Sequence, residues 1–113
     1  MSSNFDYIIV GAGSSGCVLA NRLSADPKNS VCLLEAGPPD WNPFIHIPAG
    51  FIKTLTNPSV NWLFKSEPSW GTAGRVIDIP RGKTLGGSSS INGMVFNRGQ
   101  NLDFDVWAQK GNK

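Results

Sequence analysis

The sequence of 113 residues predicts an α/β fold whose recognisable part is a single strand–helix–strand unit. Two short apolar runs, Tyr7–Val10 and Val31–Leu34, have the continuous apolar pattern of parallel strands that are buried on both faces. Between them, a glycine-rich turn leads into a segment whose apolar residues recur at helical spacing until Asp26-Pro27. We therefore expect residues 5–36 to form one βαβ unit with a helix of about three turns.

Composition and charge exclude several classes of protein. With 40% hydrophobic and 16% charged residues, the sequence is typical of a soluble globular protein. A net charge of +2 without a basic run predicts no nucleic-acid partner and no anionic membrane surface. The first apolar run is short and follows an acid, unlike a signal peptide, so we expect a cytoplasmic location.

The two cysteines, Cys17 and Cys32, lie within apolar runs and lack the spacing of metal ligands or of a disulfide framework. We expect both to be small core residues, and we expect no metal site.

The sequence beyond the βαβ unit predicts less regular structure. Residues 38–74 contain six prolines and three tryptophans and show no sustained period, so we expect an irregular insertion with a broken helix over 44–55 and a short strand over 62–65. An edge strand is expected over 75–79, and a helix over 101–110 that stops at Gly111. The three expected units are residues 1–37, 38–74 and 75–113.

Two parallel strands do not make a complete sheet, because parallel sheets are normally several strands wide and covered on both faces. We therefore expect the chain to be incomplete alone and to form the N-terminal part of a longer protein.

The turn Gly11–Gly16 has the pattern GxGxxG, directly after one expected strand and at the start of the expected helix. In this context Gly11 permits a tight turn, Gly13 lets a pyrophosphate approach the backbone, and Gly16 lets helix and strand pack closely. The amides of Ser14 and Ser15 would point from the positive end of the helix toward the phosphates. A Rossmann-like dinucleotide site is the favoured interpretation, and glycines that serve packing alone are the alternative.

Glu35 ends the second expected strand, nineteen residues after Gly16. At this place a carboxylate can accept hydrogen bonds from ribose hydroxyls and would repel a 2′-phosphate, which favours FAD or NAD over NADP. The chain then departs into the irregular insertion rather than into another helix and strand, which favours FAD. An NAD-binding dehydrogenase domain remains the alternative.

A second glycine-rich stretch, RGKTLGGSSSING, spans residues 81–93. A flexible linker is disfavoured because an expected strand precedes the stretch and the apolar residues 94–96 follow it. A serine-nucleophile loop is disfavoured because the GxSxG pattern is absent and the chain has one histidine, His46. The remaining interpretation is a second backbone cradle, in which the pair Gly86-Gly87, the serines and Asn92 offer groups to phosphates or to a polar flavin edge.

Together the two motifs resemble those of the glucose-methanol-choline (GMC) oxidoreductases. Residues 82–92, followed by Phe96, Gly99 and Asp105, fit that family's first signature. The start FDYIIVGAGSSG, the strand end LLEAG and the segment LDFDVWAQKGN extend the resemblance over essentially the whole chain.

The resemblance implies an FAD-binding domain in which the cofactor is extended, with its pyrophosphate at residues 11–16, its adenosine ribose on Glu35 and its flavin end near residues 81–95, which would cover the ring. Residues 75–100 contain no histidine for covalent attachment, so we expect non-covalent FAD. The motifs and the resemblance together imply these cofactor-binding residues: Gly11, Gly13, Ser14, Ser15, Gly16, Glu35, Ala36, Trp62, Arg81, Gly82, Leu85, Gly86, Ser88, Asn92, Gly93, Met94 and Val95.

Members of this family oxidise alcohols: a base removes the hydroxyl proton, hydride passes to flavin N5, and oxygen or another acceptor reoxidises the flavin. The resemblance thus implies a small-molecule alcohol, an electron acceptor such as oxygen or a quinone, and the remainder of the same polypeptide as partners. It places the catalytic histidine beyond residue 113, so no catalytic residue is assigned. The alternatives are lyase or decarboxylase chemistry with the same cofactor, and an FAD-binding fragment without activity of its own.

Two residue types are given structural roles. His46, with no acid nearby in sequence, is expected to be structural or exposed. The tryptophans at 41, 62, 70 and 107 are expected to pack rather than to serve as stacking platforms for a substrate.

Overall fold

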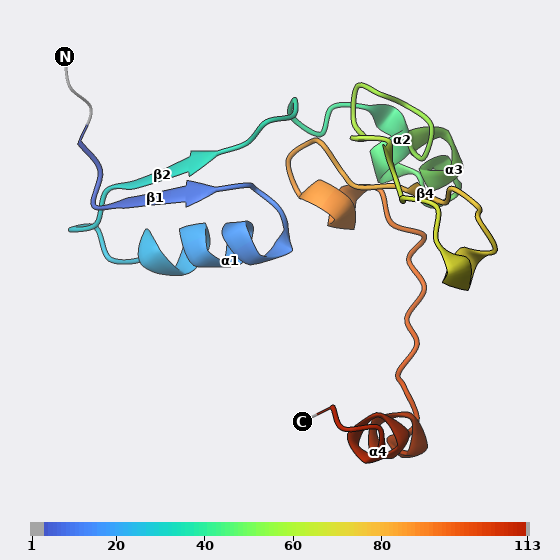
Figure 1. Cartoon of the computed structure of the whole chain (residues 1–113). Coiled ribbons are helices and arrows are strands. Elements are labelled where there is room, and N and C mark those ends of the chain that lie inside the picture. Colours follow the sequence, from blue (N-terminus) through green and yellow to red (C-terminus); the bar gives the residue numbers. More distant parts are fainter. Residues whose placement is uncertain (1–3, 113) are drawn as a thin grey trace.

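A computed structural model describes residues 4–112, and its N-terminal part is the expected βαβ unit (Figure 1). Strands β1 (Tyr7–Val10) and β2 (Val31–Leu34) pair in parallel, with Tyr7 opposite Val31 and Val10 opposite Leu34. Helix α1 (Ser14–Leu23) connects them and lies along the pair. Both strands have the predicted bounds, whereas the helix ends at Leu23 instead of continuing to Asp26-Pro27.

The remaining chain forms short elements around turns, as the proline-rich sequence predicted. The predicted broken helix is present as two helical turns with a 3₁₀ turn between them. The two short strands predicted over 62–65 and 75–79 are reduced to two residues each, and they pair antiparallel. In chain order the elements are α2 (Pro43–His46), η1 (Pro48–Gly50), α3 (Phe51–Thr54), β3 (Phe64–Lys65), η2 (Trp70–Thr72), β4 (Asp78–Ile79), η3 (Gly87–Ser90) and α4 (Asn101–Gln109).

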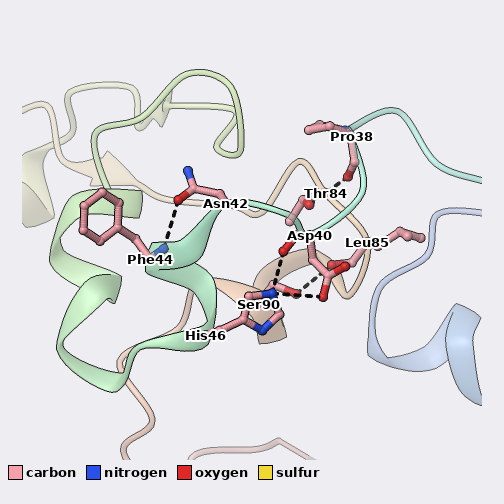
Figure 2. Close-up of polar contacts among 8 residues, drawn as sticks. All are labelled: Pro38, Asp40, Asn42, Phe44, His46, Thr84, Leu85 and Ser90. Carbon is pink, nitrogen blue, oxygen red and sulfur yellow. Dashed lines mark hydrogen bonds and ion pairs between the residues drawn. The ribbon is translucent and has the colours of Figure 1, made fainter.

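Local chemistry explains where two of these helices begin and end. Asn42 caps α2, because its Oδ1 accepts a hydrogen bond of 3.0 Å from the Phe44 amide, and Pro43 occupies the first helical position, where its missing N–H costs nothing (Figure 2). Helix α4 ends before Gly111, whose φ of +90° lies in the left-handed region that glycine adopts without strain.

The buried side chain of Asn61 organises the irregular part of the chain. Its Nδ2 donates to the carbonyl of Leu55 at 2.8 Å, and its Oδ1 accepts from the amides of Leu63 and Arg81 at 3.0 and 3.1 Å. Asn61 is 2% exposed, so water cannot replace these bonds. One amide side chain therefore joins the end of α3 to β3 and to the start of the second glycine-rich stretch.

Asp6 and Ser30 form a hydrogen-bonded pair at the amino ends of β1 and β2. The Oδ2 atom of Asp6 accepts hydrogen bonds from the Ser30 hydroxyl at 2.6 Å and from the Ser30 amide at 2.8 Å. These two bonds, the hydroxyl first, lower the pKa of the Asp6 carboxyl. The pair ties the residue before β1 to the residue before β2.

Apolar faces of the described chain lack a covering layer. The radius of gyration is 18.3 Å, whereas a compact domain of this length would have about 13 Å. Ile8 and Val10 of β1 are 63% and 83% exposed, so the strands are not buried on both faces as predicted. Figure 1 shows why: nothing lies on the far face of the strand pair, and α4 stands apart at the end of an extended segment.

The same lack of cover corrects two further predictions. Cys17 is exposed and Cys32 is half-buried, so neither is a core residue within this chain. Trp41 and Trp70 are 84% and 99% exposed, and the prediction that they pack is wrong for the described residues. Trp107 is more than half exposed but contacts Phe104 edge-on, with ring centroids 5.7 Å apart. Within residues 4–112, no helix combines the length and apolar character needed to cross a membrane.

The hydrogen bonds of Asn61 lead to a prediction. The substitution Asn61→Leu removes the buried side chain that accepts from the part-buried amides of Leu63 and Arg81, so it should lower the free energy of unfolding of the intact protein by about 1 to 3 kcal/mol. Chemical denaturation measures the effect. Asn21→Ala on the exposed face of α1 is the control and should change it by less than about 0.5 kcal/mol. Equal stabilities of the two variants would contradict the role given to Asn61.

Candidate functional site

The first glycine-rich turn joins β1 to α1. Gly11 has a φ of +95° and donates its amide to the Leu34 carbonyl at 2.7 Å, which keeps the turn on the sheet. Gly16 is buried, and a Cβ there would overlap the Gly11 carbonyl oxygen. A Cβ on Gly13 would meet no atom within 4 Å. The structure thus confirms close packing at Gly16 and leaves open space at Gly13, where the sequence predicted that a pyrophosphate approaches.

Ser14 and Ser15 form the first turn of α1, where both are exposed. Gly13 precedes them as the N-cap, and its carbonyl accepts from the Cys17 amide at 2.9 Å. No side chain caps this end of the helix, so its first amides remain available to an anion.

Glu35 is half-buried directly after β2, and backbone amides fix its carboxylate. Oε2 accepts from the Ala12 amide at 2.8 Å, and Oε1 accepts from the Gly37 amide at 3.0 Å. Each carboxylate oxygen has more than one acceptor position, so each retains capacity for a ribose hydroxyl. The predicted ribose acceptor therefore also holds the glycine turn in place, which the sequence did not reveal.

An open cleft of about 430 Å³ lies at the carboxyl ends of β1 and β2. In parallel sheets ligands bind at this edge. The cleft brings together four predicted site residues from three separate parts of the sequence. Its lining residues are Val10, Gly11, Leu34, Glu35, Ala36 and Trp62.

The second glycine-rich stretch packs directly on the first turn. The Gly86 amide donates to the Ala12 carbonyl at 2.8 Å, and the hydroxyls of Ser14 and Ser89 form a hydrogen bond. Gly87 lies so close that a Cβ on it would be 3.0 Å from the Gly13 Cα. Residues about 75 positions apart thus form one continuous surface, and the linker interpretation of residues 81–93 is wrong.

Pro38 anchors the same stretch from the other side (Figure 2). Its carbonyl accepts from the Thr84 hydroxyl at 2.8 Å and from the Leu85 amide at 3.1 Å. Thr84 is fully buried, and Leu85 is 38% exposed beside it. Gly37 permits this approach, because a Cβ there would overlap the backbone of Lys83.

Within the stretch, Gly86 has a φ of +86° and begins the 3₁₀ turn η3. Its own carbonyl accepts from the Ser89 hydroxyl at 2.9 Å. The Gly82 amide donates to the Ser88 hydroxyl at 3.1 Å, which closes the loop on itself. The exposed Arg81 directs a guanidinium nitrogen to the Pro80 carbonyl at 2.7 Å.

The residues predicted for the flavin end lie in a different place from the first cleft. Asn92, Gly93, Met94 and Val95, with Phe96, line a second open cleft of about 600 Å³. Asn92 shapes it by donating to the Ser89 carbonyl at 3.1 Å and accepting from the Met94 amide at 2.7 Å. Met94 and Val95 are 56% and 86% exposed. Eight of the seventeen predicted site residues thus line one or the other of two separate clefts.

His46 is exposed, as predicted, but an acid does lie beside it. Its Nε2 is 2.6 Å from the Asp40 carbonyl oxygen and 3.6 Å from the Asp40 carboxylate (Figure 2). The loop before α2 folds back on the helix and brings Asp40, six positions earlier in the sequence, to His46. No cluster of three metal-ligating side chains exists among residues 4–112.

Asn61, Ala12 and Lys83 lie outside the predicted set but take part in the site. Asn61 accepts from the Arg81 amide, the Ala12 backbone joins three segments, and the Lys83 ammonium lies 4.8 Å from the ring centroid of Trp62. Ala12 and Lys83 had a sequence signal, since each lies inside one of the two glycine-rich stretches. Asn61 had none, because its contact with Arg81 joins residues that are 20 positions apart.

A strand, a glycine turn, an uncapped helix start and an acid after the second strand define a dinucleotide-binding protein of the Rossmann-like class. Within that class, residues 5–113 match the GMC oxidoreductase family, and the chain belongs to this family. The resemblance stated from the sequence is thereby confirmed.

Relatives include an alcohol dehydrogenase [acceptor] from Pseudomonas putida, which is 58% identical over 95% of this chain and 19% of its own length. An oxygen-dependent choline dehydrogenase from Photobacterium profundum is 48% identical over 98% of this chain and 20% of its own length. The chain thus spans about a fifth of the length of these relatives.

Solved structures agree with this assignment. Pyridoxine 4-oxidase from Mesorbium loti matches with a TM-score of 0.80 and 42% identity over 94% of this chain and 21% of its own. A formate oxidase from Aspergillus oryzae, described for modification of its FAD, matches with a TM-score of 0.77 and 35% identity over 94% of this chain and 19% of its own. Family and neighbours confirm FAD as the cofactor, and the open backbone at Gly13 fits it.

The packing of Gly16 leads to a prediction. In Gly16→Ala the new methyl group overlaps the Gly11 carbonyl, so helix and strand must separate, and the FAD-free protein should lose about 2 to 3 kcal/mol of stability. Gly13→Ala, only three positions earlier, meets open space and should leave that stability unchanged. Thermal unfolding of the two FAD-free variants measures the difference. A Gly16→Ala variant as stable as Gly13→Ala would contradict the packing role.

Proposed function

We propose that this chain is the FAD-binding part of a flavin-dependent oxidoreductase that oxidises an alcohol, similar to choline dehydrogenase. The contact of the Gly86 amide with the Ala12 carbonyl carries the proposal, because it joins the two glycine-rich segments into one cofactor surface. The alcohol dehydrogenase and choline dehydrogenase names of the relatives support an alcohol as the substrate class.

We propose that each of the two clefts binds a different part of FAD. The amides at the start of α1 bind the pyrophosphate, the carboxylate of Glu35 accepts from the adenosine ribose, and Trp62 forms a wall at the adenine end. Asn92 to Val95 contact the flavin end. When bound, FAD supplies a ring that accepts hydride from a substrate carbon.

The residues of this chain bind and orient the cofactor, and none of them is proposed to move the substrate proton. We propose that the base lies in a further part of the polypeptide, together with the surfaces that cover β1 and α4. Binding is proposed to be non-covalent, since residues 75–100 offer no histidine for attachment. The proposed electron acceptor is oxygen or a quinone, and the proposed location is the cytoplasm.

The proposal is tested with Gly13→Val in the intact protein. Its side chain meets no protein atom near Cβ and thus spares the fold, but it fills the space where the pyrophosphate approaches the backbone. We expect FAD affinity to fall by at least about tenfold, measured by titration of the FAD-free protein with FAD and detection of flavin fluorescence.

Gly71→Ala in η2 is the matched control, since Gly71 is exposed and lies outside both clefts. Its FAD affinity should equal that of the unsubstituted protein. Normal FAD affinity of Gly13→Val would refute the placement of the pyrophosphate at this turn.

A further inference from the structure

The half-buried Lys83 lies inside the second glycine-rich stretch but takes no part in its cradle. Its amide donates to the Val60 carbonyl at 2.8 Å, which fixes its backbone beside the segment that contains Trp62 and leads into β3. The Lys83 ammonium lies 4.8 Å from the centroid of the Trp62 ring, a distance typical of cation–π contacts. No carboxylate within residues 4–112 forms an ion pair with this ammonium group.

Trp62 is restrained from several directions. Its amide donates to the Arg81 carbonyl at 2.9 Å, and its ring stacks on Phe64 with a centroid distance of 5.7 Å and an angle of 6° between planes. The indole nevertheless remains 42% exposed, because one part of it faces the cleft that Gly11 and Glu35 also line. A half-exposed aromatic ring at a ligand cleft can adopt other rotamers unless a neighbour holds it.

We infer that Lys83 is a positioning residue that holds the Trp62 indole as a wall of the cleft for the adenosine end of FAD. This inference rests on the proposed placement of the cofactor. The ammonium group attracts the negative face of the ring, 4.8 Å from its centroid. With the indole fixed before FAD arrives, less conformational entropy is lost when FAD binds.

The test measures FAD dissociation constants of the intact protein by flavin fluorescence. Lys83→Met keeps the apolar stem and removes the charge, and it should weaken FAD binding by about three- to tenfold. Lys83→Arg restores a cation that stacks on aromatic rings and should return affinity to within about twofold. Lys53→Met on the exposed face of α3 removes the same charge at a distance and should have no effect.

A double-mutant cycle separates positioning from direct contact with the cofactor. Trp62→Leu alone should weaken binding, and adding Lys83→Met to it should cause no further loss, because Lys83 acts through the indole. Undiminished affinity of Lys83→Met, or an equal loss in the Trp62→Leu background, would overturn the inference. If Gly13→Val also binds FAD normally, the proposed function fails as well. If Gly13→Val loses FAD while Lys83→Met does not, only the role of Lys83 fails.

Discussion

The candidate site depends on the backbone of one residue, Ala12. Its N–H donates to the Glu35 carboxylate and its carbonyl accepts from the Gly86 amide, each at 2.8 Å. Ala12 is fully buried, so neither group can exchange its partner for water without loss. The backbone of this one residue therefore connects the turn after β1, the end of β2 and the second glycine-rich stretch.

The glycines near Ala12 have two physical roles. At Gly16, Gly37 and Gly82 an added Cβ would overlap a backbone carbonyl, so these glycines let main chains approach each other. At Gly11 and Gly13 an added Cβ would meet open space, so packing within the chain does not require a glycine there. Gly11 is required by its positive φ, and Gly13 leaves access for a ligand.

Periodicity and turn chemistry were sufficient to predict the βαβ unit, because both depend on neighbouring residues. Tyr7–Val10, Val31–Leu34 and the final helix are present as predicted. Burial was predicted less well, because it depends on surfaces that this chain does not cover itself. The exposed faces of Ile8, Cys17 and Trp70 are the result.

The sequence supplied candidate residues for the site but not their arrangement. Glycine spacing and the acid after β2 indicated the cofactor class, but no local pattern reveals that the carbonyl of Ala12 meets the amide of Gly86. The same holds for Asn61, whose four backbone partners lie at the end of α3, just before β3 and just before Gly82. The His46–Asp40 contact also required a loop reversal that the sequence did not indicate.

The central claim is that the two glycine-rich segments form a single FAD site. A crystal structure of the intact protein with bound FAD tests it most directly. The account predicts pyrophosphate oxygens within about 2.7 to 3.2 Å of the amides that begin α1, and the flavin ring in contact with residues 92–95 of the same chain. A cofactor whose pyrophosphate lies away from residues 13–15, or whose flavin does not touch the second segment, would contradict it.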